Sequence, residues 1–207
     1  LINLMGGNDN FISKLDEVFT SPNTVHVGTY GGKIHEMTEM QMANMGQYAH
    51  GNQPIQHMIY LYNYAKQPWK AQYHARNVMD KLYDYTENGY PGDEDQGQTS
   101  SWYVLSALGF YSVCPGTDQY VLGSPVFKKT TITLENGNKF VINAPKNDKD
   151  HVYIEAASLN GQNYTKNFIT YDDILTGGTF DLKMSTSPNK ERGTGERDKP
   201  FSLSAKK

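Results

Sequence analysis

The sequence predicts an α+β protein in which a helical part is followed by an antiparallel, β-rich part. Apolar residues recur at helical spacing in residues 1–118 and alternate at strand spacing in residues 119–207. The charge changes at nearly the same place. Residues 1–120 contain 6 Lys and Arg against 12 Asp and Glu, whereas residues 121–207 contain 13 against 10. We therefore expect two parts, 1–118 and 119–207.

Five helices are expected in the first part. Asp9 or Asn10 can cap the first helix, whose apolar residues share one face. Pro54 and Pro68 stand where helices would begin, and Gly109 would terminate the last one. The expected spans are 11–19, 34–45, 55–65, 68–82 and 100–108. Helices that follow one another through loops indicate antiparallel pairs, the unit of helical bundles and toroids.

Short strands separated by turns are expected in the second part. The stretch Glu135-Asn-Gly-Asn138 lies between two alternating runs, and Asn-Gly in that position is a hairpin signal. The expected strands are 128–134, 140–144, 152–156, 168–170 and 179–184. Strands of this length and spacing are typical of an antiparallel sheet or sandwich.

Composition excludes several classes of function. Basic and acidic residues nearly cancel, at 19 and 22, which argues against a nucleic-acid partner. No apolar run is long enough to span a membrane. Cys114 is the only cysteine, so an internal disulfide and a CxxC metal site are excluded. There is also no Gly-rich phosphate loop and no G-x-S-x-G elbow. Because the chain begins at Leu1, we expect a piece of a longer polypeptide whose targeting signal is not visible.

The densest polar cluster is the loop Tyr90-Pro-Gly-Asp-Glu-Asp-Gln-Gly-Gln98, directly before an apolar helix. Helix N-termini favour negative charge. In an extended loop Asp93 and Asp95 face one side and Glu94 the other. Such a pair can raise one pKa and so provide a general base or orient a water. A solvated, inert loop would explain the same residues, so both interpretations stay open.

A second cluster, His35-Glu36-x-x-Glu39, places an imidazole and two carboxylates on one flank of a helix. The zinc-protease motif would need His at position 39, and paired carboxylates suit calcium better than zinc. An ordinary exposed helix face is the alternative. Farther on, the polar residues from His50 onward can simply cap a helix, and His57 is expected in the core.

Seven stretches together carry a resemblance to a known family, and they occur in the family's order across nearly the whole chain. They resemble glycoside hydrolase family 92, which comprises bacterial calcium-dependent exo-α-mannosidases that invert configuration. The chain corresponds to the last third or less of a full-length member. The stretches are Ile34-His-Glu-x-x-Glu-Met40, Gly46-Gln-Tyr-x-His-Gly-Asn-Gln-Pro54, His57-Met-Ile-Tyr-Leu-Tyr62, Gln67-Pro-Trp69, Gly89-Tyr-Pro-Gly-Asp-Glu-Asp-Gln-Gly-Gln98, Ala107-Leu-Gly-Phe-Tyr111 and Tyr120-Val-Leu-Gly-Ser-Pro125.

The resemblance implies that the helical part belongs to a truncated (α/α)₆ toroid with the β-rich part packed beside it. It implies hydrolysis of terminal α-mannosides of glycans, with Asp95 deprotonating the attacking water and Asp93 assisting. It also implies that His35 and Glu36 contact the mannose, and that Glu36 and Glu39 hold the calcium. Members of this kind are periplasmic or secreted bacterial proteins.

Two departures qualify these expectations. The family's general acid lies in a Glu-Gly-x-x-Trp stretch that we expect upstream of Leu1, so this chain alone should be inactive without the upstream part of the enzyme. Many members also have Glu where this chain has Gln53, which puts acid catalysis at that position in doubt. A non-catalytic glycan-binding module or a structural C-terminal unit remains the alternative function.

Overall fold

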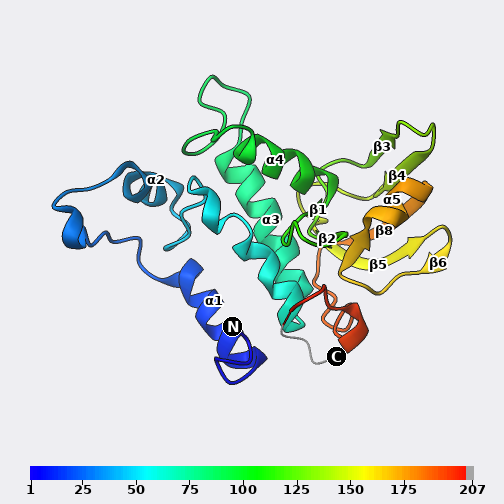
Figure 1. Ribbon diagram of the computed structural model, residues 1–207, viewed down its shortest axis with the longest axis horizontal. Coiled ribbons are helices and arrows are strands. Elements are labelled where there is room, and N and C mark those ends of the chain that lie inside the picture. The colour runs from blue at the N-terminus through cyan, green and yellow to red at the C-terminus, as the bar shows by residue number, and fades with distance from the viewer. Residues whose placement is uncertain (204–207) are drawn as a thin grey trace. The chain divides into compact units, whose positions relative to one another are not determined.

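A computed structural model describes residues 1–203 and contains both helices and antiparallel sheets, as the sequence predicts (Figure 1). The chain divides into two compact units. The first unit comprises Leu1–Met58 and Asn77–Tyr103, and the second comprises the rest of the described chain. Two helices, α3 (Pro68–Leu82) and α4 (Gln98–Leu108), contribute residues to both units. Among residues 1–203, none of the helices has the length and apolarity that crossing a membrane requires.

In the first unit, α1 (Asn8–Thr20) and α2 (His35–Ala43) confirm two of the expected helices. The expected cap of α1 is wrong. Gly7 occupies the N-cap position without a side-chain cap, and the Asn10 amide donates instead to the carbonyl of Met5. Gly7 has a φ of 124°, a conformation that disfavours the usual capping residues.

The helix expected over residues 55–65 is wrong in type, because the structure has 3₁₀ helices at Gln53–Ile55 and Met58–Ala65. Five residues of the second 3₁₀ helix are buried. Within the second unit, Tyr60 hydroxyl lies 2.7 Å from Ser106 Oγ, and the Asn63 amide donates to the carbonyl of Leu122 at 3.1 Å. A 3₁₀ helix directs side chains to three sides. Tertiary contacts on several faces therefore override the α-helical preference.

The second unit contains two sheets (Figure 1). The smaller has the order β1-β2-β7 and the larger has the order β3-β4-β8-β5-β6. The hairpin of β3 and β4 through Asn136-Gly137 confirms the prediction from the turn sequence. The strands are β1 (Phe110–Tyr111), β2 (Gln119–Leu122), β3 (Lys129–Thr133), β4 (Lys139–Asn143), β5 (Tyr153–Leu159), β6 (Gln162–Asn163), β7 (Phe168–Thr170) and β8 (Gly178–Ser185).

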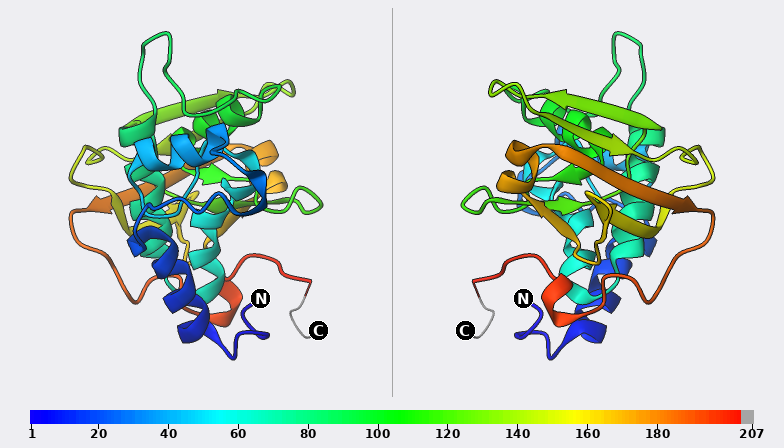
Figure 2. Two further views of the ribbon diagram at one scale, coloured as in Figure 1. Left: turned by 90° about the vertical axis from the view of Figure 1, so that its left-hand side faces the viewer. Right: turned by 90° about the vertical axis from the view of Figure 1, so that its right-hand side faces the viewer.

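One pairing departs from the antiparallel pattern. β8 runs parallel to β4 and antiparallel to β5, so it lies between two strands that precede it in the sequence. The right-hand view of Figure 2 shows β8 as a long orange arrow. The buried face of the sheet supplies most of the core of the second unit, together with Phe110 and Ile174 of α5 (Tyr171–Thr176). A capping box between Thr170 and Asp173 starts α5.

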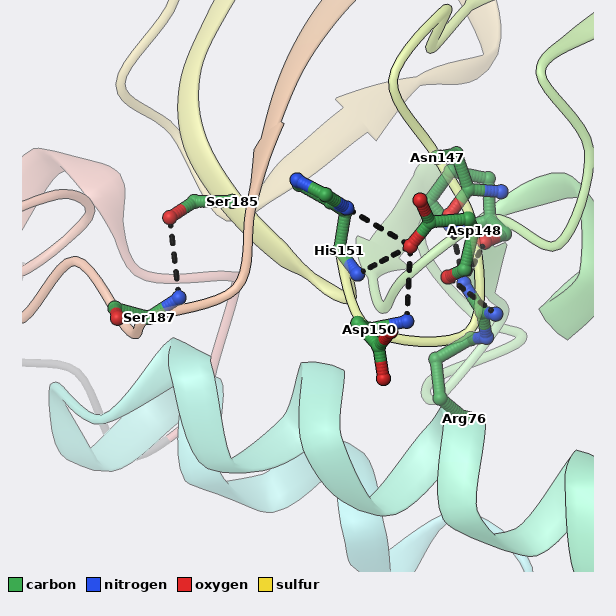
Figure 3. Close-up of polar contacts among 8 residues, drawn as sticks. Arg76, Asn147, Asp148, Asp150, His151, Ser185 and Ser187 are labelled. Carbon is green, nitrogen blue, oxygen red and sulfur yellow. Dashed lines mark hydrogen bonds and ion pairs between the residues drawn. The ribbon is translucent and has the colours of Figure 1, made fainter.

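A buried arginine of α3 holds the loop that precedes β5 (Figure 3). Arg76 Nη1 donates to the carbonyl of Pro125 at 2.8 Å and to Asn147 Oδ1 at 2.7 Å, while Nη2 donates to the carbonyl of Asp148 at 3.1 Å. The Asp148 carboxylate in turn accepts hydrogen bonds from Asp150 and His151, which hold its pKa well below the usual range. One guanidinium thus satisfies acceptors from two loops.

Candidate functional site

The charged residues of α2 form one cluster, as the helical spacing predicts. His35 Nδ1 lies 3.0 Å from Glu39 Oε1, and His35 Nε2 lies 3.3 Å from Glu36 Oε1. The hydrogen bond with Glu39 is the main cause that raises the pKa of His35. The negative charges of Glu36, Glu39 and Asp93 raise it further. The imidazole therefore sits in a negative environment to which the acidic loop also contributes.

Two buried carboxylate oxygens of this cluster lack hydrogen-bond partners among the described residues. Glu36 Oε2 and Glu39 Oε2 are both buried, and neither has a hydrogen-bond partner among the described residues. A buried carboxylate oxygen without a partner is costly, so a cation is the natural complement. Within residues 1–203, however, no three His, Cys, Asp or Glu side chains are grouped to hold a metal. The pair fits a hard cation only if backbone, water or ligand oxygens complete the shell.

The three acidic residues of the loop ahead of α4, Asp93, Glu94 and Asp95, differ in their surroundings. Glu94 accepts hydrogen bonds from the backbone N–H of Gly97 at 2.6 Å and of Ser100 at 3.4 Å. Hydrogen bonds from Ser100 and from Gly97 lower the pKa of Glu94. Glu94 therefore serves the start of α4, while the side chains of Asp93 and Asp95 are exposed.

The backbone at Asp95 is not extended, contrary to the assumption made from the sequence. Asp95 and Gln96 have φ values of 54° and 56°, in the left-handed region. This conformation costs non-glycine residues roughly 1–2 kcal/mol each and is seen in tight or functional turns. The extended conformation that would turn Asp93 and Asp95 to one side of the loop is therefore absent at Asp95. Their catalytic roles stay predictions.

Two glycines bring the acidic loop against the α2 cluster. A Cβ placed on Gly51 would lie 2.6 Å from Glu39 Oε2 and 2.9 Å from Gly92 Cα. A Cβ on Gly92, which has a φ of 69°, would lie 2.5 Å from the carbonyl oxygen of Gly51. Only residues without a side chain permit this approach. The His35 cluster and the Asp93 loop, recognised separately in the sequence, are thus neighbours in the first unit.

A buried histidine supports this junction. His50 Nδ1 lies 2.9 Å from the Tyr48 hydroxyl, and His50 Nε2 lies 2.8 Å from the Tyr83 hydroxyl. Its ring packs edge-on against Trp102 with centroids 4.3 Å apart. Burial lowers the pKa of His50 to about 3, so the imidazole is neutral and one nitrogen donates while the other accepts. This role of His50 was not predicted from the sequence, and the prediction that His57 lies in the core is wrong, because His57 is exposed.

His50 should make the stability of the first unit pH-dependent. The unfolded imidazole titrates near pH 6.5 and the folded one near pH 3, so the unfolded state binds the extra proton between these values. Stability should therefore fall as the pH is lowered from 6.5 to 4, by up to about 1.4 kcal/mol per pH unit. Urea unfolding followed by tryptophan fluorescence would measure this slope. The variant His50→Asn should have a shallower slope, and equal slopes would contradict the assignment.

Comparisons with known proteins place this chain within a family. The model of the "Glycosyl hydrolase family 92 catalytic domain" matches residues 1–186. A "family GH92 inverting mannosidase" from Bacteroides thetaiotaomicron VPI-5482 is 56% identical, with a TM-score of 0.84 over 98% of this chain and 28% of that one. A "family GH92 alpha-mannosidase" from Bacteroides thetaiotaomicron, solved with mannoimidazole, is 34% identical, with a TM-score of 0.84 over 96% of this chain and 25% of that one.

A curated relative matches nearly the whole of this chain. An "uncharacterized secreted glycosidase" of Arthroderma benhamiae is 30% identical over 99% of this chain and 24% of its own length. The chain thus spans about a quarter of the length of the relatives that it matches. Since the catalytic-domain model matches most of its residues, the chain belongs to glycosyl hydrolase family 92.

Proposed function

We propose that the full-length protein is an exo-acting α-mannosidase that hydrolyses terminal α-mannosides with inversion, and that the first unit activates the water and binds the sugar. The observation that carries this proposal is the junction at Gly51 and Gly92, which brings the acidic loop beside the cluster of His35, Glu36 and Glu39. The family membership and the relatives described as mannosidases support the substrate class.

In this mechanism Asp95 deprotonates the attacking water and Asp93 assists. An inverting glycosidase places its base and its acid roughly 6.5–9.5 Å apart, so that a water fits beneath the sugar. The exposed carboxyl of Asp95, on a backbone fixed in the left-handed region, is suited to hold such a water. The proton donor is the family's Glu-Gly-x-x-Trp glutamate, which the resemblance leads us to expect upstream of Leu1.

We further propose that Glu36 and Glu39 hold calcium and that His35 and Glu36 contact the mannose. The buried, unpartnered Oε2 atoms of both glutamates support this assignment. When bound, calcium would supply a positive charge that binds vicinal sugar hydroxyls and favours a flattened ring. The sugar and water would provide the ligands that the described side chains lack.

Chelation tests this proposal. EDTA should abolish hydrolysis of an aryl α-mannoside by the full-length protein, and added calcium should restore it because carboxylate pairs prefer a hard cation. The variants Glu36→Gln and Glu39→Gln should need more calcium for the same rate. Glu87→Gln, an exposed glutamate, serves as the control. Recovery with zinc but not with calcium would contradict the proposed site, and no hydrolysis before chelation would contradict the proposed activity.

We also propose the fold of the helical part, the class of substrate and the location of the protein. The helices would form part of an (α/α)₆ toroid, the substrates would be mannose-containing glycans, and the protein would be periplasmic or secreted. The relative described as a secreted glycosidase supports the last. The alternative of a glycan-binding β-rich module would require exposed aromatic faces. Phe168 and Phe180 are buried and the Tyr164 ring packs edge-on against Phe180, whereas Phe127 and Tyr171 are exposed.

A further inference from the structure

The side-chain amide of Gln53 holds the acidic loop directly. Gln53 Nε2 donates to the carbonyl oxygen of Asp93 at 2.7 Å and lies 3.3 Å from Thr99 Oγ1. The Thr99 hydroxyl donates to the same Asp93 carbonyl at 2.9 Å. We propose that Gln53 is a positioning residue, which fixes the backbone of Asp93 so that the carboxylates of the loop stand at the reacting water. This inference rests on the proposed function.

The network allows only one arrangement of donors. A carbonyl oxygen can only accept, so Gln53 must present its NH₂ group, and Thr99 must give its single proton to Asp93. The Thr99 oxygen then accepts from the amides of Gln53 and Gln56, both at 3.3 Å. Thr99 and Gln56 are fully buried, whereas the bond from Gln53 to Asp93 lies at the exposed end of this network. In this chain the amide of Gln53 is the donor, and a glutamate in its place would donate to these two oxygen atoms only when protonated.

Residues 51–53 hold the start of the loop at two consecutive positions. Gly51 lies against Gly92, and Gln53 binds the next residue, Asp93. The contact at the Gly92 Cα and the hydrogen bond to the Asp93 carbonyl restrict the backbone on both sides of the Asp93 Cα, while the Asp93 side chain is exposed. Catalytic groups need positional accuracy of about 0.5 Å, which residues of this kind supply. Gln53 itself reaches the backbone and not the carboxyl group, so it positions the loop without entering the chemistry.

The test is Gln53→Glu, which changes the donor into a group that donates only when protonated. In the full-length protein, the ratio of variant to wild-type kcat for an aryl α-mannoside should fall at least tenfold between pH 5 and pH 8, while KM stays within about twofold. Taking the ratio removes the pH dependence of the catalytic base itself. Gln53→Met should lower kcat equally at every pH, because it lacks a donor throughout. Gln162→Glu, on exposed β6, is the matched control and should give a flat ratio.

Hydrogen exchange separates this inference from the proposed function. The backbone N–H groups of Gly97, Gln98 and Thr99 donate within the loop. In Gln53→Glu at pH 8 they should exchange at least fivefold faster than in the wild type at the same pH. An inactive wild type combined with faster exchange would reject the mannosidase function and retain the positioning role. A flat kcat ratio with unchanged exchange would overturn the positioning role even in an active enzyme.

Discussion

The variant Asp95→Asn should lower kcat of the full-length protein toward aryl α-mannosides by about 10³-fold, within the roughly 10²–10⁴-fold that a general base contributes. Asparagine keeps the size and polarity of the side chain but cannot take the proton. It also tolerates left-handed backbone conformations better than most residues, so the φ of 54° at this position should persist. The loss should therefore appear in kcat, measured by steady-state kinetics, with little change in KM.

Two neighbours provide matched controls. Asp93→Asn should cost less than Asp95→Asn if Asp93 only assists. Glu94→Gln should leave kcat within a few-fold but weaken the start of α4, because Glu94 accepts from backbone N–H groups there. A near-normal rate for Asp95→Asn would remove that residue from the mechanism. A full loss in Asp93→Asn alone would assign the base to Asp93.

The largest effect on stability is expected for Arg76→Ala. Truncation leaves the carbonyl of Pro125 and the amide oxygen of Asn147 buried without their donor, and each such loss costs about 1–3 kcal/mol (Figure 3). The second unit should therefore lose about 3 kcal/mol or more, measured by urea unfolding with circular dichroism. The loop at Asp148, which also binds this guanidinium, should loosen at the same time.

A conservative variant at position 76 and a control variant on the same helix test this explanation. Arg76→Lys should recover only part of the loss, because one ammonium group cannot reproduce the planar fork that reaches two loops. Lys81→Ala removes an exposed cation from the same helix and should change stability by less than about 0.5 kcal/mol. An Arg76→Ala protein as stable as Lys81→Ala would show that water satisfies these acceptors.

Local patterns predicted local structure well. The Asn136-Gly137 turn and the alternating runs beside it predicted a hairpin that the structure confirms, and Pro68 marks the first residue of α3. Pairings between distant segments were not visible. The insertion of β8 beside β4 depends on a contact between strands 35 or more residues apart. Burial likewise overrode the helical pattern after residue 57 and gave a 3₁₀ helix.

In the candidate site, too, a contact within one helix was predictable and contacts between distant segments were not. The contact between His35 and Glu39 follows from spacing four apart on a helix, and the structure confirms it. The approach of Gly51 to Gly92 could not be predicted, because a glycine's lack of a side chain does not reveal what lies beside it. The hydrogen bond of Gln53 was missed for a similar reason, since its partner is a backbone carbonyl that carries no sequence signature.

The central position of β8 has a consequence during synthesis. Before residue 178 leaves the ribosome, β3 with β4 and β5 with β6 are two separate ribbons, and β4 and β5 each leave an edge open. Open edges invite pairing with other chains. A polypeptide cut short ahead of β8 would thus leave the facing edges of β4 and β5 unpaired, and we expect it to aggregate more readily than the complete chain.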